Sequence, residues 1–147
     1  MISSRKLSDL QPPVAAKIQA FIDACAAQGI DLLVTCTLRD WECQTALYAQ
    51  GRTMPGAIVT NARAGDSAHN YGLAADVVPI INGKPFWDCT SPSGAALWNK
   101  LGAIGESVGL EWAGRWSHFK EEAHFQDLTG NTLSQLKADY LAQQAAQ

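Results

Sequence analysis

The sequence predicts a small α+β domain, and three observations support that class. Helical and strand-like segments mix along the 147 residues without a regular strand–helix–strand alternation. Apolar residues recur at helical spacing in some segments and form short continuous runs in others. Hydrophobic residues make up 47% of the chain and charged residues 17%, a composition that excludes a disordered, highly charged polymer. We therefore expect residues 1–147 to form a single domain around its own core.

The first third of the chain predicts a helix, a strand and a second, shorter helix. Residues 12–28 carry apolar side chains at helical spacing, with two prolines in the first turn and Gly29 at the end. Residues 30–38 are rich in Leu, Val and Thr, which is typical of a strand. Asp40 is a suitable N-cap for a short helix that ends near Gly51.

The middle of the chain predicts a long loop followed by a buried strand. Residues 51–66 are dominated by Gly, Pro, Thr and Asn, and an ordered loop of this length is often functional. Residues 73–81 form an apolar run, and Asn82 with Gly83 then predicts a tight turn.

The last third predicts two helices separated by short strands. Residues 97–108 carry apolar side chains at helical spacing and are closed by Gly109, while residues 111–126 hold short aromatic segments. Thr132 and Gln135 form a possible capping box for a final helix. Its apolar residues are Leu133, Leu136 and Leu141.

Charge and cysteine content exclude several classes of partner. The net charge of −3 and the lack of a basic cluster argue against nucleic acid. No segment approaches the roughly 20 apolar residues of a membrane helix, and no apolar run follows the N-terminus as in a signal peptide. We therefore expect a protein that is made in the cytoplasm, and we expect it to be a monomer. Its thiols are expected to be free, since no C-x-x-C pair occurs. The cysteines are Cys25, Cys36, Cys43 and Cys89.

Two clusters of side chains could carry chemistry. His69 lies in a polar segment that leads into the apolar strand containing Asp76, where a carboxylate needs a hydrogen-bond partner or a metal. An ordinary bond to backbone or arginine is the structural alternative for Asp76. The second cluster holds Glu121, Glu122 and His124. Two imidazoles and one carboxylate form a usual catalytic zinc shell, and either glutamate could serve as a proton acceptor.

The sequences around both clusters resemble motifs of the M15 metallopeptidases. Residues 67–76, Ser-Ala-His-Asn-Tyr-Gly-Leu-Ala-Ala-Asp, match the S-x-H-x-x-G-x-A-x-D motif of that family, and Glu121-x-x-His124 matches its second motif. The segment before the first motif resembles the endolysin branch of the family. The residues that carry this likeness are Thr37, Leu38, Arg39, Gln44, Leu47, Tyr48, Gln50, Gly51, Arg52, Thr60, Asn61 and Ala62. In all, the resemblance runs from about residue 10 to about residue 142.

The resemblance implies a fold and a set of site residues. The fold is that of D-alanyl-D-alanine peptidases and the hedgehog signalling domain, a small antiparallel sheet with helices packed on it. Zn²⁺ would be bound by His69, Asp76 and His124, with Glu121 as general base. Endolysin relatives often carry Asp at the position of Glu121.

Arg39 matches the family arginine that faces substrate. Its alternative role is a surface arginine paired with Asp40 or Glu42. His118 matches no ligand. Among the tryptophans, Trp112 and Trp116 are the expected walls of the cleft because they precede the second motif.

The resemblance also implies a substrate. The favoured activity is that of an endolysin, a zinc endopeptidase that cuts the L-alanyl-D-glutamate bond of peptidoglycan stem peptides during host lysis. Such an enzyme, made in the host cytoplasm, would reach the cell wall through a holin-type pore, here without a separate wall-binding domain. A D-alanyl-D-alanine carboxypeptidase or dipeptidase is the main alternative. A non-catalytic hedgehog-like zinc module is a further one, against which Glu121 and Arg39 argue.

Overall fold

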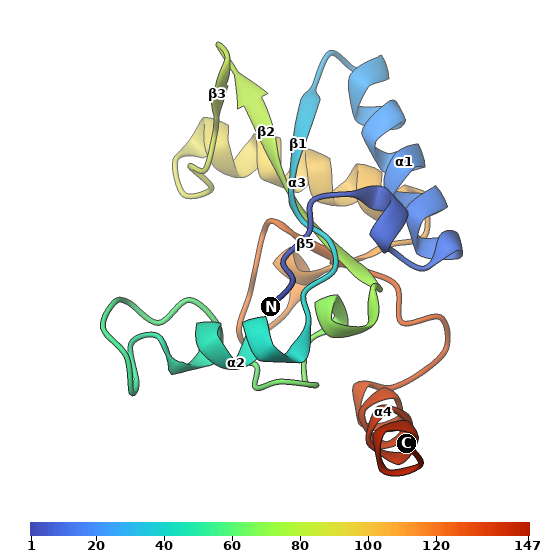
Figure 1. Cartoon of the computed structure of the whole chain (residues 1–147). Helices are drawn as coiled ribbons and strands as arrows, with labels where there is room; N and C mark the ends of the chain where they lie inside the picture. The colour runs from blue at the N-terminus through green and yellow to red at the C-terminus, as the bar shows by residue number, and fades with distance from the viewer.

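A computed structural model describes all 147 residues and shows helices packed on a small antiparallel sheet (Figure 1). The strands lie in the order β1-β2-β5-β4, and β3 pairs with the end of β2. The expected α+β class with a small antiparallel sheet is therefore confirmed. None of the helices has the length and apolar character needed to cross a membrane.

The strands are short, and their pairing brings distant segments together. Strand β1 (Asp31–Cys36) pairs with β2 (Ala74–Ile81), which pairs on its other side with β5 (His124–Gln126). Strands β3 (Lys84–Pro85) and β4 (Glu111–Trp112) add two residues each. The predicted Asn82–Gly83 turn joins β2 to β3, with both residues at positive φ.

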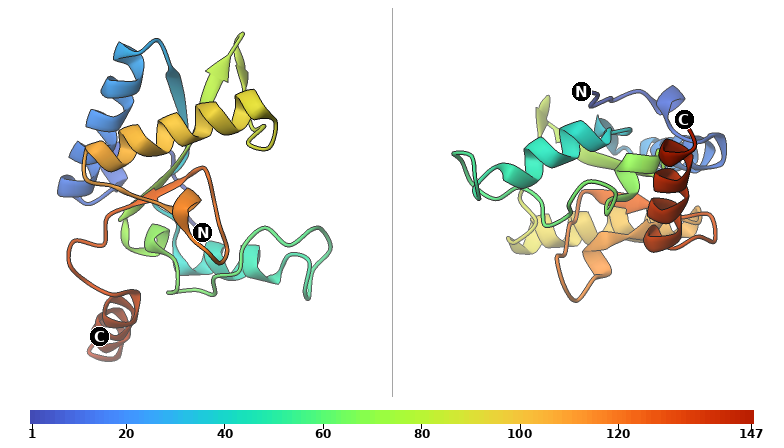
Figure 2. Two further views of the ribbon diagram at one scale, coloured as in Figure 1. Left: turned by 180° about the vertical axis from the view of Figure 1, so that it is seen from behind. Right: turned by 60° about the horizontal axis from the view of Figure 1, so that its bottom comes forward.

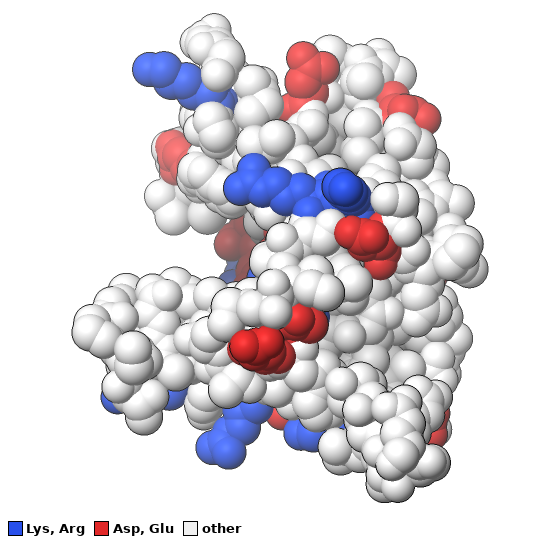
Figure 3. Space-filling model, in the orientation of Figure 1, with Lys and Arg blue, Asp and Glu red and all other residues white.

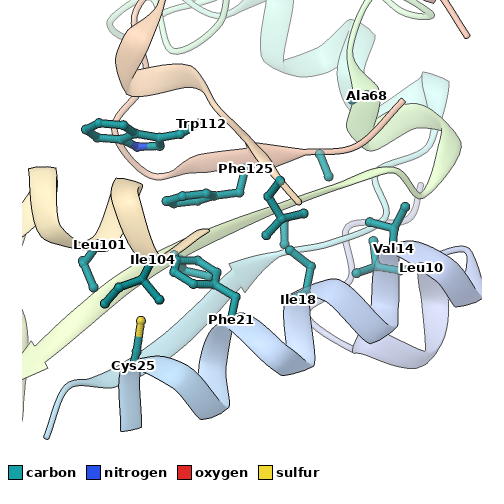
Figure 4. Packing of buried hydrophobic residues seen from close by; sticks show 14 of the residues in the cluster. Leu10, Val14, Ile18, Phe21, Cys25, Ala68, Leu101, Ile104, Trp112 and Phe125 are labelled. Atoms are coloured by element: carbon teal, nitrogen blue, oxygen red, sulfur yellow. The ribbon is translucent and has the colours of Figure 1, made fainter. Parts of the chain in front are cut away.

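Helices α1 (Pro12–Ala27) and α3 (Pro92–Ser107) build the core with the sheet, and α3 runs across the back of the molecule (Figure 2). The buried side of α1 is the predicted apolar stripe, with Ile18 and Phe21 fully buried. The Phe21 ring lies 4.5 Å from that of Phe125 in β5 (Figure 4). The two helices therefore cover the face of the sheet on which Phe125 lies.

Two glycines of α3 allow the aromatic residues of the sheet to approach the helix closely. A Cβ on Gly102 would lie 2.1 Å from the Trp112 ring, and one on Gly105 would lie 2.5 Å from the Phe125 ring. Glycine costs about 1 kcal/mol inside a helix, so its use here is explained by packing rather than by helix propensity.

The remaining elements lie away from this core. Helix α2 (Trp41–Ala49) begins at the predicted cap, where Asp40 accepts a hydrogen bond from the Cys43 amide. Residues 51–66 form the expected long loop, with no helix and no named strand. The short helix η2 (Ala68–Tyr71) follows it. Two further short helices are η1 (Leu7–Asp9) and η3 (Ala113–Arg115).

The C-terminal helix α4 (Leu133–Ala145) starts with the predicted capping box but buries none of its residues. It is held instead by a stack of Tyr140 on Trp41, with ring centres 4.1 Å apart, and by a Lys137–Asp66 ion pair. Of its apolar residues, Leu141 is exposed, so the apolar stripe predicted from the sequence only partly meets the core.

Candidate active site

The sheet register places three possible metal ligands in one row. Asp76 of β2 lies opposite His124 of β5 on one side and opposite Cys36 of β1 on the other. Paired residues on neighbouring strands point to the same face, so these three side chains share a face. Phe125, next to His124, points to the core on the opposite face. The site therefore lies on the side of the sheet away from α1 and α3.

His69 joins this row from the short helix η2. The Ser67 hydroxyl caps that helix by accepting from the His69 amide, and Gly72 ends it at positive φ. His69 Nε2 lies 3.0 Å from Asp76 Oδ1 and 3.2 Å from His124 Nδ1, while His124 Nδ1 lies 3.3 Å from the same Asp76 oxygen. Three donor atoms thus form a nearly equilateral triangle.

The triangle has the size that a tetrahedral zinc ion requires. Nitrogen and oxygen ligands about 2.0–2.1 Å from such an ion lie about 3.3–3.4 Å from one another. The far nitrogens of both imidazoles also have acceptors: His69 Nδ1 lies 2.7 Å from the Thr37 carbonyl oxygen, and His124 Nε2 lies 2.8 Å from Gln126 Oε1. When these far nitrogens carry the protons, both lone pairs face the triangle, as metal ligation demands. The residues present therefore fit zinc.

The charges within the triangle are tightly coupled. Burial disfavours a charged imidazole, but the neighbouring Asp76 carboxylate outweighs this effect and raises the pKa of His69 to about 10. Burial would likewise raise the pKa of Asp76, yet the two imidazoles hold it well below its ordinary value. A proton on His69 therefore neutralises Asp76 in the metal-free protein, and a metal cation would take the place of that proton.

Glu121 lies beside the triangle, whereas Glu122 contacts other groups. Glu121 Oε2 is 3.7 Å from His124 Nδ1, and its side chain is half exposed to the cavity. The Glu122 side chain also reaches the cavity wall, but its nearest charged partner is Lys120 at 3.9 Å and its backbone carbonyl accepts from the Trp112 indole. Glu121 is thus the glutamate nearer to the possible ligands.

Arg39 lines the same cavity without an acidic partner. Its guanidinium donates to Gln44 Oε1 at 3.0 Å and to Cys36 Sγ at 3.4 Å, and its buried Nε has no partner. The alternative pairing with Asp40 or Glu42 does not occur, because both carboxylates lie near the N-terminal amine instead. The guanidinium charge therefore remains available to an anionic group in the cavity.

The cavity has a volume of about 580 Å³ and opens between the loop 51–66 and the segments around Trp87 and Phe119. Figure 3 shows a hollow on this side of the molecule, with acidic and basic atoms inside it. Trp116 lines the cavity as expected. The same expectation is wrong for Trp112, which is buried against Phe125 because its position in β4 turns it to the core face. Trp87 and Trp98 form the wall instead.

Sequence patterns did not reveal Cys36 as a neighbour of the site. Its sulfur and the donor atoms of His69 and Asp76 lie within 4.8 Å of one another, a spacing compatible with a shared metal. Only the pairing of β1 with β2 shows this, since the cysteine lies 40 residues before Asp76 and outside both motifs. His118 is exposed and does not line the cavity, as expected. All four cysteines are free; three of them are buried, and Cys89 is partly buried.

Comparison with known proteins places this site in a family. An M15 peptidase family model, described as D-alanyl-D-alanine carboxypeptidase, matches residues 60–127. The chain is similar to the peptidoglycan L-alanyl-D-glutamate endopeptidase CwlK of Bacillus subtilis, with 40% identity over 123 residues, 81% of this chain and 74% of the relative.

Solved structures show the same fold at lower identity. The L-Ala D-Glu endopeptidase ChiX of Serratia marcescens has a TM-score of 0.60 at 19% identity, over 85% of this chain and 87% of its own. The vancomycin resistance D,D-pentapeptidase VanY, solved with Zn(II), has a TM-score of 0.58 at 16% identity, over 88% and 78%. The predictions of family and of enzymatic activity are thereby confirmed. The chain belongs to the M15 family of zinc metallopeptidases.

Proposed function

We propose that this protein is a zinc endopeptidase that cuts the L-alanyl-D-glutamate bond of peptidoglycan stem peptides. The observation that carries the proposal is the triangle of His69, Asp76 and His124, open to a cavity that also holds Glu121 and Arg39. The likeness to CwlK, which covers most of both chains, supports the choice of bond.

In this proposal His69, Asp76 and His124 hold the metal. Zinc bound there would lower the pKa of a water molecule and polarise the scissile carbonyl. Asp76 would be the only anionic ligand. Because the two imidazoles would be neutral, the site would carry a net positive charge when the divalent ion is bound. The Thr37 carbonyl and the Gln126 amide oxygen fix the ring orientation of the two histidines.

Glu121 is the proposed general base. Its carboxylate lies close enough to the triangle to accept a proton from a water molecule in the cavity, and it is exposed enough to deliver that proton to the departing amine. The only other carboxylate within 4 Å of His124 Nδ1 is that of Asp76. Asp76 is a proposed metal ligand and therefore cannot also serve as the base.

Arg39 is the proposed substrate anchor. A guanidinium without an acidic partner, held by Gln44 and Cys36, presents a fixed positive charge to the cavity. Such a group suits either a substrate carboxylate or the oxyanion that forms at the scissile carbonyl. The D-glutamate of the stem peptide carries a free carboxylate next to the bond to be cut, which matches this charge.

Mass analysis of fragments released from purified peptidoglycan tests the choice of bond. Cleavage at L-alanine–D-glutamate leaves L-alanine on the glycan and releases peptides with D-glutamate at the new N-terminus. The Glu121→Ala variant serves as the control for contaminating hydrolases. Release of free D-alanine with the stem peptide otherwise intact would refute the proposal.

The second candidate is a D-alanyl-D-alanine carboxypeptidase, which would give that refuting outcome, or a dipeptidase, which would leave the peptidoglycan uncut. The description of the matching family model favours this candidate. Incubation with the dipeptide D-Ala-D-Ala and with a pentapeptide separates the two forms of it. Activity on either substrate, without release of D-glutamate peptides, would replace the proposed endopeptidase.

For the physiological role, we propose host lysis by the chain acting as a single-domain, monomeric endolysin. The likeness of the segment from Arg39 to Arg52 to endolysins supports this role. Cytoplasmic expression in a bacterium should be harmless until a pore-forming holin is co-expressed, and lysis should then follow within minutes. If cells lyse equally with the Glu121→Ala variant, the pore rather than the peptidase is responsible.

A further inference from the structure

A row of polar contacts runs from His124 to the surface, on the side of the ring away from the triangle. His124 Nε2 lies 2.8 Å from Gln126 Oε1, and Gln126 Nε2 lies 3.4 Å from Glu111 Oε1. The indole nitrogen of Trp116 lies 2.8 Å from the other oxygen of Glu111. Gln126 is buried, whereas Glu111 is exposed at the start of β4. None of these three residues belongs to the two motifs or to the proposed roles of Glu121 and Arg39.

The chemistry of the groups allows only one direction of donation along this row. An indole N–H can only donate, and an ionised carboxylate can only accept. The amide nitrogen of Gln126 must therefore face Glu111, which turns the amide oxygen toward His124. That oxygen can only accept, so His124 Nε2 must carry the ring proton. In the neutral imidazole the remaining nitrogen, Nδ1, then presents its lone pair to His69 and Asp76.

We infer that Gln126 and Glu111 are positioning residues that select the tautomer of His124 competent to bind metal. The inference rests on the proposed zinc site and extends it to residues outside that site. If the Gln126 amide were free to turn, its NH₂ group could face the ring. The ring proton would then move to Nδ1, where it would point into the triangle and occupy the place of the ion.

The other imidazole is fixed by a different device. His69 Nδ1 donates to the backbone carbonyl of Thr37, an acceptor that no substitution removes. His124 depends instead on side chains, and the outermost of them, Trp116, also lines the cavity with its ring 5.6 Å from the His124 ring. The two ligands should therefore differ in their sensitivity to distant substitutions.

Two variants and one control test the row. Gln126→Met keeps the length of the side chain and removes its hydrogen bonds, and Glu111→Ala frees the amide to turn. Glu106→Ala is the matched control, because Glu106 is another partly exposed glutamate whose partner is Arg115 rather than the row. Zinc affinity is measured by competition with a chelator, and the tautomer of His124 by imidazole NMR of the metal-free and zinc-loaded protein.

We expect Gln126→Met to weaken zinc binding roughly 10–100-fold, the usual effect of losing a group that orients a ligand. Glu111→Ala should weaken it less, by up to about 10-fold, because water can replace an exposed carboxylate. The NMR signal of the Nε2 proton should be present in the wild type and exchange faster in both variants. Glu106→Ala should match the wild type in both measurements.

The double variant Glu111→Gln/Gln126→Glu separates polarity from simple packing. The amide at position 111 can accept from Trp116 and donate to the carboxylate at position 126, which accepts from His124 Nε2. The direction of donation is preserved, so zinc affinity should return to within about threefold of the wild type.

Two outcomes would overturn the inference. The first is a Gln126→Met variant whose zinc affinity and His124 tautomer equal those of the wild type. The second is a wild-type protein in which the ring proton of His124 lies on Nδ1. Either result would show that the row does not select the tautomer. Failure of the metal site itself is recognised separately. If His124→Ala retains zinc, the ligand assignment is wrong; if it loses zinc while Gln126→Met binds normally, only the inference about the row fails.

Discussion

Two neighbouring residues of strand β5 lie in opposite environments. Phe125 contacts Phe21 of α1 and Trp112 of β4 in a dry apolar core, whereas His124 faces charged groups and a cavity. The alternation of a strand separates them within one residue. The face of the sheet that carries Phe125, here called the core face, holds the apolar burial that accounts for most of the folding free energy. The face that carries His124, here called the site face, holds groups whose interactions favour a metal and a substrate. Stability and activity should therefore respond to different substitutions on the same strand.

The largest expected effect is the loss of activity without loss of fold in Glu121→Ala. Removal of a general base typically lowers the rate by about 10²–10⁴-fold, while zinc content and melting temperature should stay near those of the wild type. Glu122→Ala is the matched control and should matter far less. Should Glu122→Ala be the inactive variant, the assignment of the base is shifted by one residue.

The core face should show the reverse pattern. Phe125→Ala removes a fully buried ring that Phe21 and Gly105 contact, and should lower the free energy of unfolding by roughly 3–5 kcal/mol. Leu141→Ala, at an exposed position of α4, should change it by less than about 0.5 kcal/mol. Urea unfolding of both variants measures the difference. A small loss for Phe125→Ala would show that the core can collapse around the missing ring.

Arg39 tests whether the site face can be altered without cost to the core. Arg39→Ala should lower kcat/KM on stem peptides by roughly 10²-fold or more, taking a lost oxyanion donor as the guide. Zinc content should not change, because the guanidinium contacts Gln44 and Cys36 but none of the proposed ligands. A lower melting temperature with normal specific activity would indicate a structural role instead.

The pH dependence of zinc affinity reports on the charges of the site face. Because the pKa of His69 is raised to about 10, the pairing of its proton with Asp76 stabilises the metal-free fold fully below about pH 6.5 and is lost as the pH rises through 10. Zinc must displace this proton, so its affinity should rise about tenfold per pH unit between pH 6 and 8. Calorimetric titration in several buffers would count the proton released. An affinity independent of pH would exclude His69 as a ligand.

A small effect is expected at the solvent-exposed edge of the core, where α1 meets the end of β5. Lys17 of α1 binds Asp127 just beyond β5 and, against the effect of burial, holds the pKa of that carboxyl below its ordinary value. This pairing stabilises the fold above the unfolded pKa of about 3.9 and is lost as the pH falls through the lower folded value. Lys17→Met should cost at most about 1 kcal/mol at pH 7, since the lysine is more than a third exposed. Thermal unfolding at pH 7 and in acid should show that difference shrinking.

Local patterns predicted most of the elements because each depends on a few adjacent residues. The apolar stripe of α1, the Asp40 cap of α2 and the Thr132 capping box occur where the sequence places them. The motif around His69 and Asp76 likewise named candidate ligands by resemblance. Whether these residues hold zinc stays a prediction, but the structure brings their donor atoms within 3.3 Å of one another.

Side-chain direction in short strands was beyond the reach of the sequence. Strand β4 has only two residues, so no alternation shows which face Trp112 takes, and the expectation that it walls the cavity is wrong. The role of Trp98 in the cavity wall was not predicted for a different reason, which is that helix α3 brings it there from a segment distant in the sequence.

The sequence by itself determined the four α-helices, the buried strand β2 and the kinds of side chain available for metal chemistry, because helix caps, periodicity and motifs are local. The tertiary structure alone decided which side chains meet. Cys36, Asp76 and His124 form one row only through the register of three strands that lie about 40 residues or more apart in the chain. The tautomer of His124 depends in turn on Glu111, which reaches Gln126 only through the pairing of β4 with β5. Register is set by the burial of the whole core face, a property that no single segment of the sequence carries.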